Sequence, residues 1–389
     1  MTAALWLIGY YKKPNGLKLG FGYAIYASTA LNNLIDKIAE ASKRAWKVWF
    51  TSGWFVFGIA TAVAIYILGG DLLKELSSIA PVATVMPVVP GLTIPLAPGL
   101  LALAVTVIVH ELSHAIAARS GGVKVKRLGI IFILALPIGA FTEPDETSFN
   151  EAPHKTKLRI LAAGSLANFA TAAFAVGLLS VFLLGYPSTP SAVVVQGIIP
   201  HTLASSLGLK GGYLIYAINN TRTNTLTALS SALASSRPGQ LVTLVTNHGN
   251  LTGRLGAVPP GYGDSDKGFI GIYLNSMPFF APRLYLGLSV PAWLQIEVYG
   301  FWIWFINLNV GIFNALPIPM LDGDQFFKEL VAMLKEKGLS LTIGNGVVYG
   351  LEAISIGLLF ANLIFSLSVL LRNANNMRRV RKTSRILRQ

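Results

Sequence analysis

Cysteine is absent from this chain of 389 residues, and charged side chains are scarce. Without cysteine no disulfide can form, and any metal site must use histidine and carboxylate ligands. Charged residues make up 12% of the sequence, whereas a soluble domain usually contains about a quarter, and 53% of the residues are hydrophobic. Because water would not solvate so much apolar surface, the composition predicts a multi-pass α-helical membrane protein.

Acidic residues are few as well, with 17 against 31 lysines and arginines and a net charge of +14. The basic residues cluster beside apolar segments, which favours contact with anionic lipid and the marking of membrane topology over nucleic-acid binding. We therefore expect the lipid bilayer, and no nucleic acid, as a partner. Residues 1–11 are apolar but short, and no small-residue cleavage site clearly follows them, so a cleavable signal peptide is not evident.

Five apolar segments are long enough to cross a bilayer. They lie at about residues 48–69, 94–118, 158–185, 286–316 and 341–371. An amphipathic, basic segment, residues 1–47, precedes the first of them, and we expect a surface helix within it at residues 23–45. A second interfacial helix is predicted at residues 325–338, and residues 372–389 form a basic C-terminal tail.

The loop at residues 119–127 sets the orientation of these spans. It is rich in lysine and arginine, and the positive-inside rule therefore places it in the cytoplasm. With five spans the two ends of the chain lie on opposite sides, although both flanks are basic. Either the tail is an exception to the rule, or a segment interpreted as peripheral also spans the membrane.

An apolar stretch at residues 128–141 is too short to span. It has only fourteen residues and is interrupted by Pro137 and Gly139. Non-helical backbone at membrane depth is tolerated where protein or a water-filled cavity satisfies its polar groups. We therefore predict a re-entrant strand or β-hairpin here.

Residues 190–285 differ from the rest, because short runs of Val, Ile, Leu and Thr alternate with Gly, Pro and polar residues. The runs at residues 193–198, 213–219 and 241–246 predict strands, and residues 226–235 predict a helix. This pattern is typical of a soluble α+β domain. It divides the predicted membrane core into residues 48–189 and residues 286–371.

A metal-binding pattern lies inside the second apolar segment, where His110 and Glu111 are followed by His114. On a helix, residues four apart share a face, so the two imidazoles can bind one metal ion. Glu111 lies beside them, where a carboxylate can accept a proton from water at that metal. His-Glu-x-x-His is the arrangement of zinc proteases, and ionisable groups in a membrane span usually face a polar cavity or each other. The alternative is a hydrogen-bonded pair of core histidines.

Asp322 is the candidate third ligand, because a catalytic zinc site usually takes three protein ligands. It follows an apolar span, just after Pro317 and Pro319, which break helical geometry. The other three histidines lie in polar loops. Taken with the histidine pair, Asp322 is predicted to bind the metal. The alternative is that Asp322 and Gly323 form an ordinary turn at a helix end.

Two separated motifs therefore carry the chemistry, with a soluble domain between them. The first is His110-Glu111-x-x-His114, and the second is Asn314-x-x-Pro317-x-Pro319-x-Leu321-Asp322-Gly323. In this order they resemble the site-2 protease family of intramembrane metalloproteases, over roughly residues 95–340. The family's Gly-x-x-x-Asn element is matched by Gly164 and Asn168, and its membrane-associated hairpin or loop by residues 128–141.

The resemblance implies that His110, His114 and Asp322 bind one Zn²⁺ and that Glu111 is the general base and acid. The chain would be an intramembrane zinc endopeptidase that cleaves transmembrane segments of membrane-anchored substrates, as in regulated intramembrane proteolysis. Asn168 and Asn314 could hydrogen-bond substrate backbone or the developing oxyanion. Their alternative role is hydrogen bonding between membrane helices.

The inserted domain resembles a PDZ domain of the circularly permuted type found in proteases, with residues 198–220 as the matching stretch. Such domains bind extended peptides by adding a strand to a sheet edge. The alternative is a size filter that keeps folded proteins from the membrane site. The expected fold is thus a multi-pass helical membrane protein with a re-entrant hairpin and an inserted α+β PDZ-like domain.

The predicted placement is a cell membrane, with the active site inside the bilayer near the cytoplasm and the PDZ-like domain outside. Three alternatives to this function are a membrane-anchored protease with a soluble catalytic head, a catalytically silent scaffold that binds peptides, and a transporter. The histidine pair inside an apolar span disfavours the first. The intact motif residues disfavour the second, and the absence of an inverted repeat of spans disfavours the third.

Overall fold

The computed structural model describes residues 16–386, except residues 21, 78–84, 134–135, 184–188, 260–265, 275–278, 282–287, 289 and 339. The expectation for residues 1–11 therefore lies outside the described residues. The chain forms two compact units. The first comprises the chain up to residue 175 and from residue 301 onward, and the second comprises residues 176–300.

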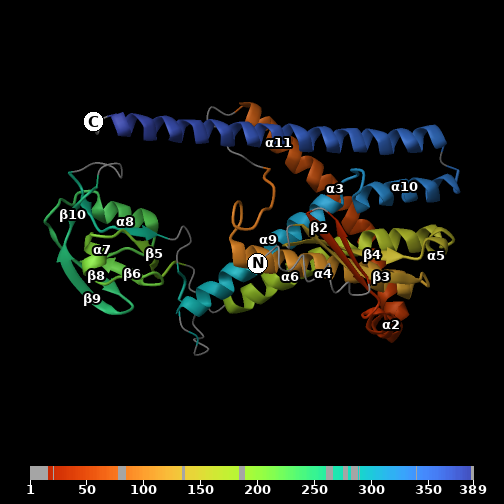
Figure 1. The fold of residues 1–389 in the computed structure, drawn as a ribbon, viewed down its shortest axis with the longest axis horizontal. Helices are drawn as coiled ribbons and strands as arrows, with labels where there is room; N and C mark the ends of the chain where they lie inside the picture. Colours follow the sequence, from red (N-terminus) through yellow and green to blue (C-terminus); the bar gives the residue numbers. More distant parts are fainter. Residues whose placement is uncertain are drawn as a thin grey trace. The chain divides into compact units, whose positions relative to one another are not determined.

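Five helices in the described part of the chain are long and apolar enough to cross a membrane. They are α3 (Lys43–Ser77), α4 (Leu96–Ser120), α6 (His154–Leu183), α9 (Val290–Asn314) and α11 (Leu341–Ile386). All five correspond to predicted spans, but α3 and α11 are longer than expected. Residues 372–386 of the predicted basic tail are part of α11, a continuous helix in Figure 1. Neither glycine nor proline occurs between residues 372 and 386 to end that helix.

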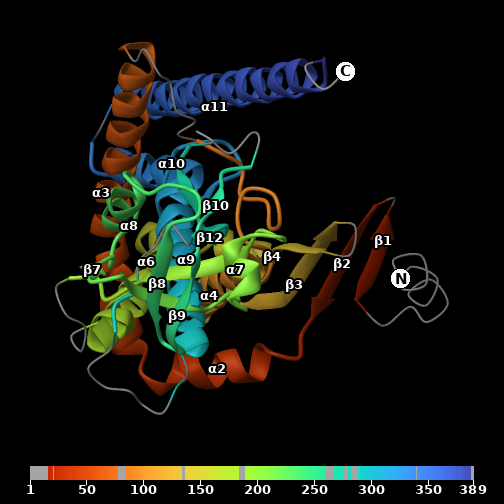
Figure 2. The same ribbon diagram turned by 90° about the vertical axis from the view of Figure 1, so that its left-hand side faces the viewer.

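A four-stranded antiparallel sheet belongs to the first unit, with the strand order β1-β2-β3-β4 (Figure 2). Its strands are β1 (Leu17–Gly20), β2 (Tyr23–Ser28), β3 (Val125–Ile133) and β4 (Leu136–Pro144). The predicted surface helix at residues 23–45 is wrong for its first part, since Tyr23–Ser28 is a strand and only α2 (Asn32–Ala41) and the start of α3 are helical. Tyr26 pairs with Ile130, more than a hundred residues away. Pairing with a distant hairpin therefore decides the conformation of this β-prone stretch.

Two glycines end α4 and direct the chain into the hairpin. The Gly121 N–H donates to the carbonyl oxygens of Ala117 and Ala118, and Gly122 has a φ of +85°. A left-handed glycine after the last helical turn is the usual way in which a helix ends. The strand β3 begins three residues later, so the motif-bearing helix and the hairpin are joined by a short connection.

The loop between α9 and α10 (Asp322–Lys335) is fixed by close contacts. The Thr61 hydroxyl on α3 donates to the carbonyl oxygen of Ala315 at 2.7 Å. A Cβ atom at Gly323 would lie 2.2 Å from the carbonyl oxygen of Leu316, so only glycine allows the loop to pass this close to the helix. The Phe326 ring packs on Phe57, with 4.6 Å between centroids. These contacts determine where α10, and therefore Asp322, begins.

His154 joins the far part of α10 to the start of α6. Its Nδ1 atom lies 2.5 Å from Glu329 Oε1, and its Nε2 atom lies 3.1 Å from Glu336 Oε1. Lys157 adds a longer ion pair to Glu329. One imidazole thus bridges two carboxylates, one in the middle of α10 and the other on the residue that follows its last turn.

We expect His154→Ala to lower the melting temperature by several degrees, because hydrogen bonds to charged groups contribute about 1.5–3 kcal/mol when partly buried. Thermal unfolding in detergent measures the change. Lys155→Ala is the control, because Lys155 forms no ion pair within the described residues. Equal melting temperatures for the two variants would show that the bridge does not hold α10.

The second unit contains an α+β domain. Its elements are β5 (Val193–Ile198), α7 (Leu203–Ser206), β6 (Leu214–Ile218), β7 (Thr221–Arg222), α8 (Leu226–Leu233), β8 (Leu241–Thr246), β9 (Gly249–Arg254), β10 (Gly256–Ala257), β11 (Gly268–Phe269) and β12 (Ile272–Leu274). Its larger sheet has the order β12-β5-β6-β8-β9, with β7 beside β6. The three strands and the helix predicted from the sequence are present. Alternate residues of the central strands, such as Val193, Ile215 and Leu244, form the core.

Candidate metal centre

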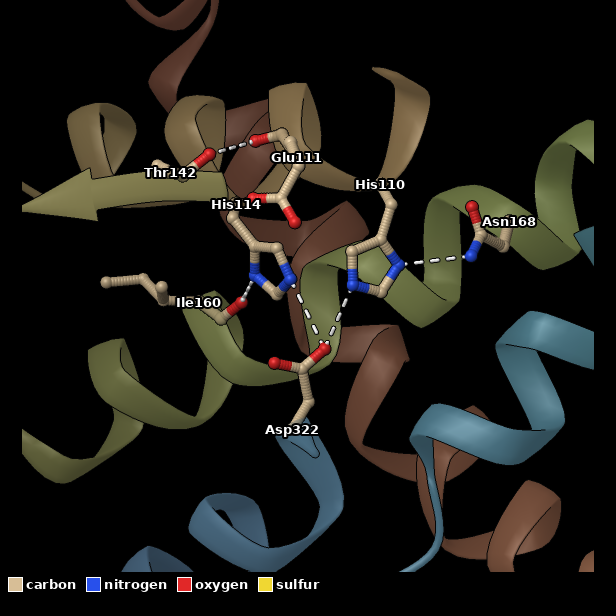
Figure 3. Close-up of polar contacts among 7 residues, drawn as sticks. All are labelled: His110, Glu111, His114, Thr142, Ile160, Asn168 and Asp322. Carbon is tan, nitrogen blue, oxygen red and sulfur yellow. Dashed lines mark hydrogen bonds and ion pairs between the residues drawn. The ribbon is translucent and has the colours of Figure 1, made fainter. Parts of the chain in front are cut away.

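Two histidines and one aspartate from distant parts of the sequence converge on one point. His110 and His114 are one turn apart on α4, so both imidazoles lie on the same face of the helix. Asp322 is the first residue of α10, and its Oδ2 atom lies 3.1 Å from Nε2 of His110 and 3.3 Å from Nε2 of His114. Figure 3 shows the carboxylate facing both rings. The three side chains offer ligand atoms that lie within 4.8 Å of one another.

The other ring nitrogen of each histidine is held from α6. Nδ1 of His114 lies 2.7 Å from the carbonyl oxygen of Ile160, which can only accept, so this nitrogen carries the proton. In the neutral form of the ring Nε2 then carries no proton, so it can bind a metal once it has lost any proton shared with Asp322. Nδ1 of His110 lies 3.0 Å from the side-chain amide of Asn168 (Figure 3).

The Asn168 amide fits a metal-binding state of His110. Asn168 is completely buried, and its Oδ1 atom has no hydrogen-bond partner in the described part of the chain. The two ends of an amide have nearly the same shape, and turning the group over exchanges oxygen and nitrogen. Oδ1 would then accept the Nδ1 proton of His110, leaving Nε2 of that ring free for a metal.

Gly164 lies directly against the two rings. A Cβ atom at this position would be 2.4 Å from Nε2 of His110 and 2.5 Å from Nε2 of His114. Only glycine therefore leaves space beside both nitrogen atoms. Gly164 and Asn168 are one turn apart on α6, so both lie on the same face of that helix. This face of the Gly-x-x-x-Asn element packs against the histidine pair.

The ligand set fits zinc. Burial raises the pKa of the Asp322 carboxyl, but His114 and His110, when protonated in the metal-free site, lower it more, so the pKa lies below its usual value and the carboxylate is an anion. Two imidazole nitrogens and one carboxylate oxygen make a set of three protein ligands with a fourth position open, as in catalytic zinc sites. Tetrahedral ligands at zinc distances lie about 3.3 Å apart. The contacts of 3.1 and 3.3 Å agree with that spacing.

A cavity of about 780 Å³ lies beside the cluster and has the three ligands in its wall. Glu111 and Asn314 line the same cavity, and in Figure 3 the Glu111 carboxylate extends toward the imidazoles. The larger apolar side chains in its lining are Val107, Phe141, Phe149, Ile160, Leu161, Val310, Met320 and Leu321. The cavity thus offers apolar contacts beside several convergent polar and charged groups, the combination by which a binding site both holds and orients a ligand.

The hairpin forms one border of this cavity through residues 139–144 of β4. The Thr142 hydroxyl donates to the backbone carbonyl of Glu111 at 2.7 Å, which fixes β4 to the turn of α4 that carries the motif (Figure 3). Within the described residues β4 pairs only with β3, so its second edge has no strand partner.

The structure brings together most of the predicted site. His110, His114 and Asp322 form the cluster, while Glu111 and Asn314 share the cavity beside it. Asn168 is not part of the cavity lining and contacts His110 from behind. Its geometry fits the second of the two roles considered, a hydrogen bond between membrane helices, and that bond orients His110. The Ile160 carbonyl was not predicted, and a backbone acceptor leaves no signal in a sequence.

The remaining histidines are engaged elsewhere. His154 bridges Glu329 and Glu336, and His248 stacks on Tyr213 with 4.2 Å between ring centroids. His201 lies in the loop after β5 with a φ of 60°. Among the described residues, no other group of three histidines or carboxylates could hold a metal ion.

Comparison with known proteins agrees with this geometry. The sequence model of peptidase family M50, the site-2 protease family, matches residues 98–358, which is more than half of the chain. The chain is a member of peptidase family M50. The resemblance noted from the two motifs is thereby confirmed.

Related sequences extend over most of this M50 peptidase. An uncharacterised protein of Methanocaldococcus jannaschii is 29% identical over 287 residues, which cover 73% of this chain and 69% of that protein. Proteins of Clostridium acetobutylicum and Nostoc sp., each named "Putative zinc metalloprotease", are both 25% identical. Their matches cover 61% and 63% of this chain and 87% and 88% of the relatives. The M50 peptidase is a membrane zinc metalloendopeptidase.

We expect Asn168→Leu to weaken zinc binding about 10- to 100-fold, because loss of a group that orients a metal-ligating histidine has effects of this size. Zinc affinity of the purified M50 peptidase, measured by competition with a chelating dye, tests this. Asn307→Leu is the control, since Asn307 is also completely buried but donates only to its own helix. Unchanged zinc affinity in Asn168→Leu would contradict the orienting role.

Proposed function

We propose that this M50 peptidase hydrolyses peptide bonds within transmembrane segments of membrane-anchored proteins. The observation that carries the proposal is the metal cluster itself. Its two histidines lie within α4, a helix long and apolar enough to span a membrane, and they face a cavity lined by both apolar and polar side chains. A site built in this way is reached most readily by a substrate that is itself in the bilayer.

The proposed roles follow from the positions of the side chains. His110, His114 and Asp322 hold Zn²⁺, which when bound supplies a Lewis acid that polarises a peptide carbonyl and makes water more acidic. Glu111 accepts the proton of the attacking water and returns it to the leaving amine. Asn314, in the cavity wall, offers an amide N–H to the developing oxyanion or to substrate backbone.

The hairpin suggests how a substrate is presented. A transmembrane helix hides its carbonyl groups in internal hydrogen bonds, so the segment must be extended before it can be cut. The free edge of β4 runs along the cavity and could pair with such an extended segment. We infer that the hairpin is re-entrant and lies at membrane depth, where the protein satisfies its backbone groups.

The orientation that we propose puts the metal centre nearer the cytoplasm. The centre lies in the second half of α4, and the basic loop of residues 119–127 follows. If the five spans alternate in direction, the domain of residues 190–285 lies on the outer side of the membrane. The basic end of α11 then lies on the outer side as well, as an exception to the positive-inside rule. Cleavage near the cytoplasm would release a substrate's inner part, as in regulated intramembrane proteolysis.

We further propose that the α+β domain is PDZ-like and binds peptide. Its strand β12 is the last in the sheet order, and an extended peptide could add to such an edge. If the domain is instead a size filter, its removal will widen the range of substrates without lowering the affinity for any peptide.

The test is to map the bond that is cut. The protein is reconstituted in liposomes with a substrate that has a single transmembrane segment, and the fragments are weighed by mass spectrometry. We expect cleavage within the apolar segment that is inhibited by a zinc chelator and restored by zinc. Cleavage confined to extramembrane loops would contradict the intramembrane function and would indicate a protease that cuts water-exposed segments.

A further inference from the structure

Met320 occupies a backbone position that favours glycine. The Leu321 N–H donates to the carbonyl oxygen of Ile318 at 3.0 Å, which closes a four-residue turn over residues 318–321. Pro319 is the second residue of this turn, and Met320 is the third, with a φ of +80°. These are the features of a type II turn, in which the third residue needs a positive φ and is usually glycine or asparagine.

A side chain in this conformation is strained, and the strain persists only where something else requires it. Of the described non-glycine residues, only His201, Asn219 and Met320 have a positive φ. Asparagine tolerates this region through local hydrogen bonds, whereas methionine has no such means. A glycine at position 320 would allow the same turn without the strain.

Packing does not explain why methionine stands here. Met320 is 96% exposed, so its side chain is not part of any hydrophobic core of the described residues. It does line the cavity that holds His110, His114 and Asp322, and it precedes Asp322 by only two residues. A flexible apolar side chain is thus held out from a strained turn at the wall of the reaction cavity.

We propose that Met320 is a specificity-determining residue that contacts the substrate side chain next to the bond being cut. The contact rests on the proposed function, and its ligand is an apolar side chain of an extended peptide segment. Methionine suits this role because its unbranched thioether adapts to side chains of different shape. Leu321 and Val310 add further apolar side chains to the lining of the same cavity.

Met320→Gly separates this role from a structural one. Glycine relieves the turn, so the variant should melt at the wild-type temperature or above it and retain the wild-type zinc content. Substrates differ only in the residue beside the mapped cleavage site, which is alanine, leucine or phenylalanine. We expect kcat/KM to fall about tenfold or more for leucine and phenylalanine, because that is the effect of losing a large apolar contact, and to change little for alanine.

Two further variants complete the test. Met320→Leu keeps an apolar side chain and should preserve the wild-type order of substrates. Leu92→Gly removes another side chain that is highly exposed but absent from the cavity lining, and should leave kcat/KM unchanged. If Met320→Gly lowers kcat/KM equally for all three substrates, or for none, the proposal is overturned. If wild-type protein cuts no substrate within its apolar segment, the proposed function fails instead, and the two failures are distinct.

Discussion

Glu111→Gln should abolish peptide cleavage while the protein keeps its zinc. The Glu111 carboxylate extends into the cavity beside the cluster but is not one of the three ligands. Glutamine keeps the shape and loses the ability to accept a proton. A positioned general base contributes about 10²- to 10⁴-fold to such a reaction, so we expect a rate loss at the upper end of this range or beyond.

Cleavage in liposomes and zinc content by atomic absorption, measured on the same preparation, test this expectation. Glu143→Gln is the matched control, because Glu143 lines the same cavity but pairs with Arg127. Its activity should stay within about threefold of wild type, in keeping with the small energy of an exposed ion pair. A Glu111→Gln variant that cuts at more than about a tenth of the wild-type rate would exclude Glu111 as the general base.

Gly164→Ala should prevent the formation of the zinc site. The added methyl group would lie within 2.5 Å of Nε2 of both histidines, far inside van der Waals contact. The rings cannot move aside freely, because His114 is bound to the Ile160 carbonyl and His110 to Asn168. Catalytic ligands must be held to about 0.5 Å, so we expect zinc affinity to fall about a hundredfold or more and cleavage to fall with it.

The control is Gly177→Ala on the same helix, where a Cβ atom would meet nothing within 4 Å. Alanine is a better helix former than glycine, so this variant should be at least as stable as wild type and fully active. Zinc affinity and cleavage are measured for both variants together with their helix content by circular dichroism. Wild-type zinc affinity in Gly164→Ala would show that the two rings are not arranged around a metal as we describe.

The parts of the molecule that carry strong local patterns could be predicted from the sequence. Apolar length predicts α4 and α6, and the spacing of His110 and His114 fixes a shared helix face. Asp322 could be assigned only together with that pair, since Asp-Gly also forms turns. Alternating apolar residues in the soluble domain predicted β5, β6 and β8 correctly.

What could not be predicted depends on contacts between distant residues. Tyr23–Ser28 forms a strand because it pairs with β3, although the same residues also suit an amphipathic helix. The sequence left open whether the Asn168 amide contacts substrate or joins two helices, and its place behind His110 is set by the packing of α6 on α4. The positive φ of Met320 has no sequence signal either, because a methionine after proline does not indicate a type II turn.

Titration of metal-free protein with zinc is the measurement that tests the central claim most directly. Each addition is followed by cleavage of a transmembrane substrate in liposomes. We expect activity to rise in proportion to zinc and to stop rising at one ion per chain, while Asp322→Ala gains little activity at the same zinc concentrations. Full activity in the metal-free protein, or equal activation of Asp322→Ala, would contradict a zinc centre built from His110, His114 and Asp322.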